Sequence, residues 1–342
     1  MLRRTFFLGV GASAAPLLLA RHASAAQELR VLVHGSFSLP KPLLAQFESD
    51  SGIRLAIVKG GDAGEMLNKL ILTRAEPIAD VVFGIDNLLV AKADAAQVLE
   101  PYRGPAAGRS VRATLDGAVV PVDYGYVTLN YDKGWFAARA VALPGTLDAL
   151  AGPGWRDRVA LPNPATSSPG FAFLVATIAG LGEEAAFDWW ARMRANGLRV
   201  TKGWSEAYYT EFSRNGGTRP IVLSYASSPA AEVFYSKEKL TEPPTASLFL
   251  DGGVMRQVEG VALVRGARQR EAAGRFIEFL RSAPVQQALQ TSMWMYPVET
   301  GAVRVDALRY AVEPARFQDP APALVAARGA QWVARWTRVV LK

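Results

Sequence analysis

The stretch VVPVDYGYVTLNYDK, residues 119–133, decides how this chain is organised. It is rich in valine and tyrosine, which favour β-strands. One series of alternating strands and helices precedes it and a second series follows it. We therefore interpret residues 119–133 as an extended segment that crosses from a first α/β lobe to a second one.

The half before this crossing has the pattern of a βαβαβ unit. Such alternation implies a parallel sheet with helices on both faces. Ligands of such sheets bind beyond the carboxyl ends of the strands, so the loops at 34–38, 60–64 and 84–87 should line one cleft. The expected strands are ELRVLV (28–33), IRLAIV (53–58) and ADVVFGID (79–86), and the expected helices are residues 41–51 and a second one carrying Met66, Leu67, Leu70 and Ile71 on one face.

The half after the crossing contains the motif Ser-Ser-Pro at two expected helix starts. Ser167 and Ser168 stand just before Pro169, the arrangement expected of a helix N-cap followed by proline in the first turn. After an expected strand at 221–225, two serines again precede a proline. The free N–H groups of a helix start can hold an anion. The stretch VEGVALVRGA (258–267) is expected to return to the first lobe, followed by a helix at 270–283 and an aromatic turn at 292–298.

Composition excludes several classes of function. The chain has 342 residues and half of them are hydrophobic, which is enough for two lobes with their own cores. It has no cysteine, so disulfides, thiol catalysis and thiolate metal sites are excluded. Outside the first 25 residues, His34 is the only histidine, and GWSEA departs from the nucleophile elbow of serine hydrolases at its last position. GGDAGE lacks the ending of a phosphate-binding loop. We therefore expect that the protein is not an enzyme and that it has no metal site.

Residues 1–25, MLRRTFFLGVGASAAPLLLARHASA, have the features of an export signal. Two arginines precede an apolar run that ends in an A-x-A cleavage pattern, typical of either a Sec or a twin-arginine signal. Its removal takes away three arginines and no acidic residue, which lowers the formal net charge from +7 to +4. No dense basic block accompanies this charge, so we expect neither nucleic acid nor a membrane surface as partner. No later segment is apolar for long enough to span a membrane.

An exported protein with two lobes, extended crossings and no catalytic equipment is what a ligand-capturing protein that closes about a hinge would look like. Five motifs in the same order along the chain strengthen this interpretation. GIDN, VPVDYGYVTLNYDK, TKGWSEAY, VLSYASSPA and WMYPV resemble the thiamine-binding periplasmic proteins, the capture components of thiamine ABC importers.

The resemblance implies a two-lobed periplasmic-binding-protein fold of type II, each lobe a mainly parallel sheet flanked by helices and joined by a hinge. We expect residues 26–121 and about 260–300 to form lobe 1, residues 122–259 to form lobe 2, and residues 301–342 to pack on the lobes. The resemblance further implies a periplasmic monomer without a cofactor that captures thiamine, thiamine monophosphate or thiamine diphosphate and passes it to an inner-membrane ABC permease.

By position, the ligand contacts of that family fall on eleven residues. The thiazolium ring is a permanent cation, which favours an aromatic face by about 0.5–2 kcal/mol, so Trp204, Tyr225 and Trp294 could form an aromatic box. Asp62 suits the aminopyrimidine, and the serines suit a phosphate. The implied contacts are Asp62, Ala63, Ser167, Ser168, Trp204, Tyr225, Ala226, Ser227, Ser228, Pro229 and Trp294.

The chain departs from the family at two places. It has HGSFSLPKP (34–42) where relatives carry YDSF with a tryptophan a few residues on, and Ala231 where a tyrosine is common. Because these aromatic side chains are absent, the preferred phosphorylation state of the ligand stays open, and a thiamine precursor is an alternative ligand. Two further hypotheses are ferric iron delivery through Tyr208 and Tyr209 and a serine hydrolase that uses His34. We expect Asp123, Tyr124 and Tyr126 to serve as hinge and packing residues.

Overall fold

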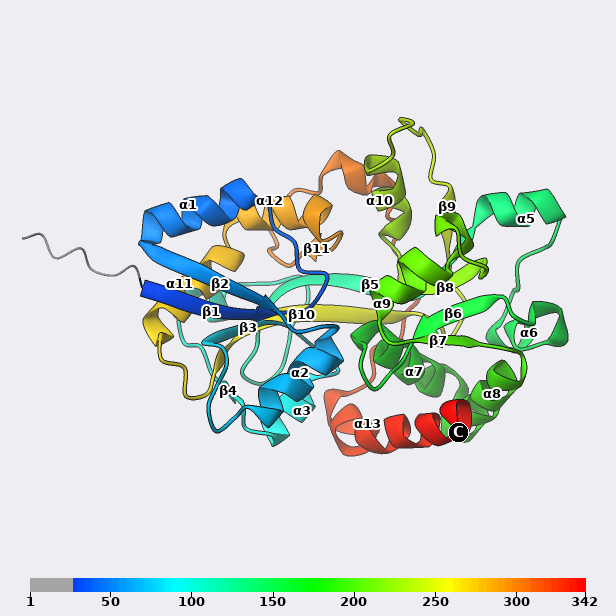
Figure 1. Cartoon of the computed structure of the whole chain (residues 1–342), viewed down its shortest axis with the longest axis horizontal. Coiled ribbons are helices and arrows are strands. Elements are labelled where there is room, and N and C mark those ends of the chain that lie inside the picture. Colours follow the sequence, from blue (N-terminus) through cyan, green and yellow to red (C-terminus); the bar gives the residue numbers. More distant parts are fainter. Residues whose placement is uncertain (1–26) are drawn as a thin grey trace, which may run out of the picture.

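A computed structural model describes residues 27–342, which form two α/β lobes placed side by side along the long axis of the molecule (Figure 1). The expected export signal at 1–25 lies outside the described residues. The predicted architecture, with mainly parallel strands flanked by helices in each lobe and crossing strands between the lobes, is confirmed.

Lobe 1 contains the expected βαβαβ unit. Its first strand pairs in parallel with the second and the third, with Val31 opposite Ile57 on one side and Val81 on the other. Gly52, in a left-handed conformation, ends the first helix as its position in the sequence predicts. The elements are β1 (Gln27–Val33), α1 (Lys41–Ser51), β2 (Ile53–Lys59), α2 (Ala63–Leu72), β3 (Val81–Asp86), α3 (Val90–Ala95), β4 (Leu99–Glu100), α4 (Pro105–Gly108), α11 (Arg270–Leu280), α12 (Ala283–Ser292) and β11 (Tyr296–Pro297).

Two long antiparallel strands, β5 (Val120–Asp132) and β10 (Met255–Val264), join the lobes. β10 pairs with β3 of lobe 1, and the second half of β5 pairs with β8 and β9 of lobe 2. The strand order β2-β1-β3-β10-β5-β8-β6-β7 therefore forms one continuous sheet. We propose that the boundary between the lobes falls within these two strands, near the expected bounds 121/122 and 259/260.

Lobe 2 has the same plan. β6 pairs in parallel with β7 and β8, and Asp132 and Thr146 cap the helices that follow them. The elements are α5 (Lys133–Arg139), α6 (Leu147–Leu150), β6 (Val159–Pro162), α7 (Ser168–Leu181), α8 (Glu183–Ala195), β7 (Arg199–Thr201), α9 (Trp204–Glu206), β8 (Ile221–Tyr225), α10 (Ser228–Phe234) and β9 (Thr245–Leu248). Short 3-10 turns lie at Pro153–Trp155, Ser213–Asn215 and Asp306–Tyr310, and π-helical turns at Ala207–Glu211 and Thr337–Leu341.

The C-terminal helix α13 (Pro322–Trp336) packs on helices of both lobes. Trp336 is fully buried and meets the edge of Trp190 with 5.6 Å between ring centroids. The indole Nε1 of Trp332 donates to Glu183 at 2.9 Å, and Arg328 pairs with the same carboxylate at 2.7 Å. The helix also touches α3 of lobe 1. Its amphipathic face thus packs on α7 and α8 and also on α3, so that α13 contacts both lobes.

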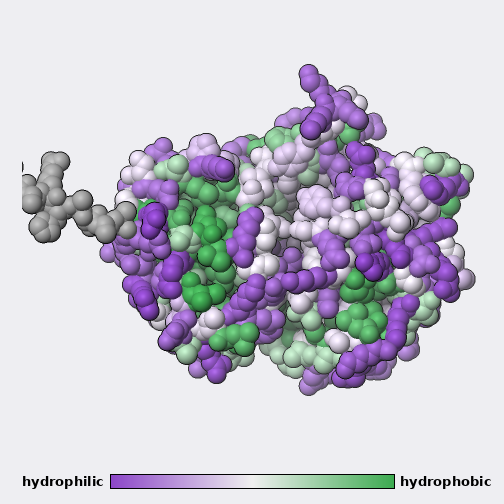
Figure 2. Space-filling model, viewed as in Figure 1, coloured by the Kyte–Doolittle hydropathy of each residue, from purple (hydrophilic) through white to green (hydrophobic). Residues whose placement is uncertain are grey.

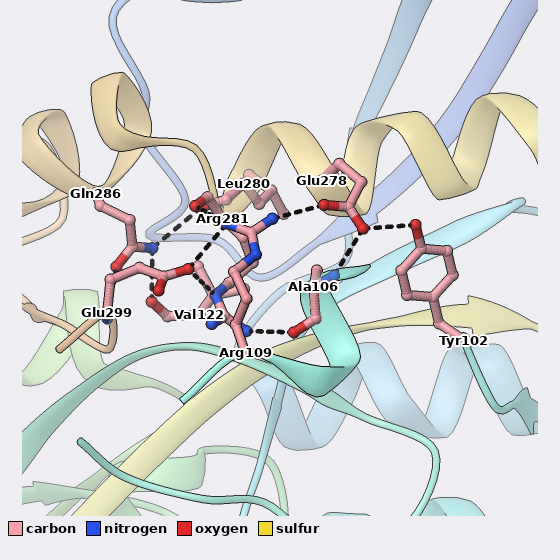
Figure 3. Close-up of polar contacts among 9 residues, drawn as sticks. All are labelled: Tyr102, Ala106, Arg109, Val122, Glu278, Leu280, Arg281, Gln286 and Glu299. Atoms are coloured by element: carbon pink, nitrogen blue, oxygen red, sulfur yellow. Dashed lines mark hydrogen bonds and ion pairs between the residues drawn. The ribbon is translucent and has the colours of Figure 1, made fainter. Parts of the chain in front are cut away.

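A buried polar cluster fixes the loop that follows β4 onto lobe 1 (Figure 3). The side chain of Arg281 is fully buried, and it donates to Glu299 Oε1 and to the Ala106 carbonyl, each at 2.9 Å. Arg109 pairs with both Glu278 and Glu299. Two guanidinium groups and two carboxylates therefore neutralise one another, which is what permits a charged side chain at this depth.

Hydrophilic and apolar side chains are unevenly distributed over the surface (Figure 2). Among residues 27–342, no helix combines the length and apolar character needed to cross a membrane. Hydrophilic side chains cover much of both lobes on the face drawn in Figure 2, and apolar ones gather over the edge of lobe 1 at β1 and β2, where Val58 is 53% exposed.

Trp336→Ala should lower the free energy of unfolding by about 3–5 kcal/mol, because it removes a fully buried indole from the contact between α13 and α8. Leu324→Ala, at a half-exposed position of the same helix, should change it by no more than about 0.5 kcal/mol. Equilibrium urea unfolding followed by circular dichroism measures both. Equal effects of the two substitutions would contradict the packing role of α13.

Candidate ligand-binding cleft

A cavity of about 400 Å³ lies between the two lobes. The loop after β1 and the start of α2 contribute to it, as the parallel sheet predicts. The third expected loop, 84–87, does not reach it, because the side chain of Asn87 bonds to the backbone of Arg256 and Val258 on β10. The lining residues outside the predicted set are His34, Ser36, Pro169, Tyr208, Tyr209, Arg214, Asn215, Ala231, Glu232, Tyr235, Ser236, Lys237, Glu238, Glu259, Met293 and Met295.

Eight of the eleven predicted contact residues line this cavity, namely Asp62, Ala63, Ser168, Trp204, Tyr225, Ser227, Ser228 and Trp294. The other three do not reach it. Ser167 is fully buried, and as the N-cap residue it lies one position before the helix residue that faces the cavity. Ala226 continues the β8 pairing with its N–H on the Tyr126 carbonyl, and Pro229 is buried in the first turn of α10.

Trp204 is held in one orientation by lobe 2. Its ring stacks on Tyr208 with centroids 5.2 Å apart and an interplanar angle of 23°. Its indole Nε1 donates to the hydroxyl of Ser224 at 2.9 Å, and Tyr225 meets it edge-on at 6.5 Å. The half-buried ring is therefore a fixed aromatic wall of the cavity.

Trp294 enters the cavity from lobe 1 and contacts a different group of aromatic rings. It packs edge-on against Phe234 at 5.3 Å and Tyr235 at 5.7 Å, both from α10. Its backbone has a φ of +60°, a left-handed conformation that costs a bulky residue on the order of 1–3 kcal/mol. Trp294 directly follows the C-cap residue of α12, where its N–H donates to the Leu289 carbonyl at 3.1 Å, and a left-handed residue is common at such a helix end. The predicted box thus consists of two adjacent rings, Trp204 and Tyr225, with Trp294 in a separate cluster.

The sequence reasoning missed Tyr235 and Glu259 as cavity residues. A signal existed for Tyr235, because it lies four residues after Ala231 and hence on the same face of α10. Glu259 carried no local signal, since its place depends on which strands neighbour β10. Tyr208 and Tyr209, named above only as possible iron ligands, both line the cavity. Tyr208 is buried and Tyr209 is 60% exposed.

The two tyrosines are poorly suited to holding ferric iron. Burial, together with the neighbouring charge of Glu232, raises the pKa of Tyr208 well above its usual range. Its hydroxyl donates to Glu232 at 2.8 Å, and the Tyr209 ring lies at 80° to it. Within the described residues there is no group of three or more His, Cys, Asp or Glu side chains that could hold a metal ion. A serine hydrolase would require a hydrogen bond between His34 and a serine hydroxyl. In the same part of the chain, His34 Nε2 makes no hydrogen bond.

The lobes touch across the cleft. Asp62 Oδ2 of lobe 1 accepts the Trp204 N–H of lobe 2 at 2.9 Å, and the Glu65 N–H donates to the Thr166 carbonyl at 3.0 Å. Lys202 pairs with Glu65 at 3.3 Å. The residues after β7 and before α7 thus meet the start of α2, which is a closed arrangement of the two lobes.

Comparison with known proteins gives consistent results. A family model described as bacterial extracellular solute-binding protein matches residues 76–321. The thiamine-binding periplasmic protein of Salmonella typhimurium is 32% identical over 331 residues, which cover 95% of this chain and 97% of that protein. The solved structure of a periplasmic thiamin binding protein superposes with a TM-score of 0.81 at 31% identity, covering 92% of this chain and 96% of the other. An iron-bound protein from Pseudomonas aeruginosa, at 19% identity and a TM-score of 0.73 over 92% of this chain and 99% of the other, shares the fold.

Gly64→Val should favour an open arrangement of the lobes. A Cβ at Gly64 would come within 3.0 Å of the Thr166 backbone across the cleft, and backbone atoms cannot move aside as a side chain can. Small-angle scattering should show a larger radius of gyration than for the unmodified protein, with little change in unfolding temperature.

Gly154→Val is a suitable control, because nothing lies within 4 Å of the added Cβ. It should leave the radius of gyration unchanged. If both variants have the dimensions of the parent, contact at Gly64 does not set the closed arrangement.

Proposed function

Since the chain belongs to the bacterial extracellular solute-binding proteins, with thiamine-binding periplasmic proteins among its relatives, we propose that it captures thiamine or a thiamine phosphate. Solute-binding proteins of this class act in ABC import from the periplasm. We further propose that the protein acts as a monomer and delivers this ligand to an inner-membrane permease. A Sec or twin-arginine signal would bring the chain to the periplasm.

The fixed aromatic wall at Trp204 is the observation that carries the proposal. A thiazolium ring keeps its positive charge at every pH, and the face of an indole is the best aromatic partner for a cation. Trp204 is stacked on Tyr208 and bonded to Ser224, so no side-chain freedom has to be lost when a ligand stacks on it. Tyr225 and Trp294 line the same cavity.

Carboxylate and hydroxyl groups of the cavity suit the rest of the molecule. Asp62 accepts one hydrogen bond through Oδ2, and its other oxygen can accept from the amino group of an aminopyrimidine. Ser168 opens the 14-residue helix α7, where free N–H groups favour an anion. Ser227 and Ser228, together with Arg214 and Lys237, line the same cavity and offer further donors to a phosphate.

Two substitutions relative to the family bear on the choice among thiamine forms. Ala231 and His34 both line the cavity, so the aromatic side chains that relatives carry there would have been cavity walls. Tyr235, one helical turn after Ala231, returns an aromatic ring to the same face of α10. A thiamine precursor that fills the wider space is therefore the alternative ligand within the same fold.

Isothermal titration of the refolded mature protein tests the ligand directly. We expect sub-micromolar binding of at least one among thiamine, its monophosphate and its diphosphate, because an importer must scavenge. A gain in affinity with each phosphate would support the role of Ser168 and the α7 start. Ferric citrate should give no heat, and binding of ferric citrate alone would replace the proposal with iron capture.

Trp204→Ala should weaken binding of the preferred form by about 1–3 kcal/mol, or roughly 5- to 150-fold in dissociation constant, the range found when a stacking aromatic residue is truncated. The same titration measures it. Trp135→Ala is the matched control, because Trp135 is a half-buried tryptophan of lobe 2 away from the cavity. A change below twofold in Trp204→Ala would exclude the stacking role.

A further inference from the structure

Three carboxylates lie opposite one another on three neighbouring strands, at the place where the lobes are joined (Figure 1). Glu259 on β10 stands opposite Asp86 on β3 and opposite Asp123 on β5. Residues directly opposite in an antiparallel pair share one face of the sheet, and like charges there are destabilising. We call Asp86, Glu259 and Asp123 the carboxylate row.

The three carboxylates of the row differ in their hydrogen-bond partners and in their burial. Asp86 accepts from the N–H groups of Leu88 and Leu89 at 3.0 and 2.9 Å and from Gln257 Nε2 at 2.6 Å. Asp123 is fully buried, and neither of its oxygens has a hydrogen-bond partner within residues 27–342. Glu259 is 5% exposed and lines the cavity.

Few charged groups surround the row. Glu259 has His34 Nε2 at 3.5 Å, too long for a good hydrogen bond. Asp62 at the start of α2 adds a further negative charge, and the Tyr225 hydroxyl faces the row through its bond to Gln257 Oε1 at 2.8 Å. In the described part of the chain, neither lysine nor arginine lies within ion-pair distance of Asp86, Asp123 or Glu259. Glu259 is therefore the member of the row that lines the cavity, and within residues 27–342 no fixed cation pairs with the row.

Adjacent buried carboxylates cannot all stay charged without compensation. Burial, and then the charge of Glu259, raises the pKa of Asp123 well above its usual range, and burial raises the pKa of Asp86 to about 6. The fully buried Asp123 carboxyl, which has no hydrogen-bond partner within residues 27–342, therefore favours its protonated form. A cation entering the cavity beside Glu259 would supply the missing charge.

We propose that Glu259 at the cavity wall, with Asp123 behind it on the neighbouring strand, forms the subsite for the positive charge of the ligand, and that the arriving cation displaces a proton from Asp123. The inference rests on the proposed function and names the group that selects a permanently charged organic ring. A quaternary ring nitrogen has no N–H to donate, so its recognition here is by charge. The displaced proton passes to the solvent, and the total charge of the pair plus its partner is conserved.

The affinity for a cationic ligand should then depend on pH in a defined direction. The bound cation stabilises the ionised carboxylates and lowers the pKa of Asp123 from its raised value. Between the pKa of the ligand-bound state and that of the free state, binding releases a proton, so the affinity for a cationic ligand falls as the pH drops. An uncharged ligand of the same shape displaces no proton, and its affinity has no such dependence.

The test uses thiamine and its uncharged analogue in which carbon replaces the quaternary ring nitrogen. Titration calorimetry at one pH in two buffers of different ionisation enthalpy counts the protons released. The unmodified protein should release protons with thiamine only. Glu259→Gln should weaken thiamine binding about tenfold or more, change the analogue less than threefold, and reduce the proton release.

Asp123→Asn provides a second variant that alters the pair from the other strand, and it should reduce the proton release as well. Glu271→Gln, an exposed carboxylate on α11 away from the cavity, and Asp188→Asn, an exposed one on α8, should change nothing. Unfolding temperatures of all four variants confirm that each chain is folded before titration.

The outcomes separate the two proposals. Equal weakening of both ligands in Glu259→Gln, or thiamine binding without proton release, would overturn the cation subsite and leave thiamine capture intact. Absence of binding by the unmodified protein to thiamine, its monophosphate and its diphosphate would overturn the proposed function, and the subsite with it. Selective loss of the charged ligand together with its proton release supports the subsite.

Discussion

The antiparallel pairing of β5 with β10 is the constraint on which the rest of the structure depends. Each strand carries the chain between the lobes, and the register that sets Glu259 opposite Asp123 also fixes which loops face one another. Because β3 and β8 flank this pair, the ends of the parallel strands of both lobes open toward one cavity. A shift by one residue would turn the carboxylate row and Gln257 to the other face of the sheet.

The elements of the fold were predictable where the signal is local. The strands expected at 28–33 and 53–58 are observed as β1 (Gln27–Val33) and β2 (Ile53–Lys59), since a buried strand is a short apolar run bounded by turns. The stretch 119–133 contains β5 because its valine and tyrosine residues favour an extended conformation. The π-helical turn after α9 had no such signal, because its geometry follows from packing of Tyr208 and Phe212 on lobe 2.

The candidate site was predictable in its loops but less so in its side chains. Position in a motif places Ser167 and Ser168 together, yet only Ser168 lines the cavity, because neighbouring residues at a helix start point in different directions. Asp62 and Trp204 are 142 residues apart, and their hydrogen bond exists only because the lobes close. Glu259 could not be assigned from the sequence, since the meaning of a strand carboxylate depends on the residues opposite it, and these come from two other segments.

The placement of the tryptophans has an optical consequence. Of the eight in the chain, only Trp204 and Trp294 line the cavity, and they belong to different lobes. The indole of Trp204 responds to whatever stacks on it, whereas the surroundings of Trp294 change when α10 moves away with Phe234 and Tyr235. The intrinsic fluorescence of the protein therefore contains two separable reporters, one for occupancy of the cavity and one for the relative position of the lobes.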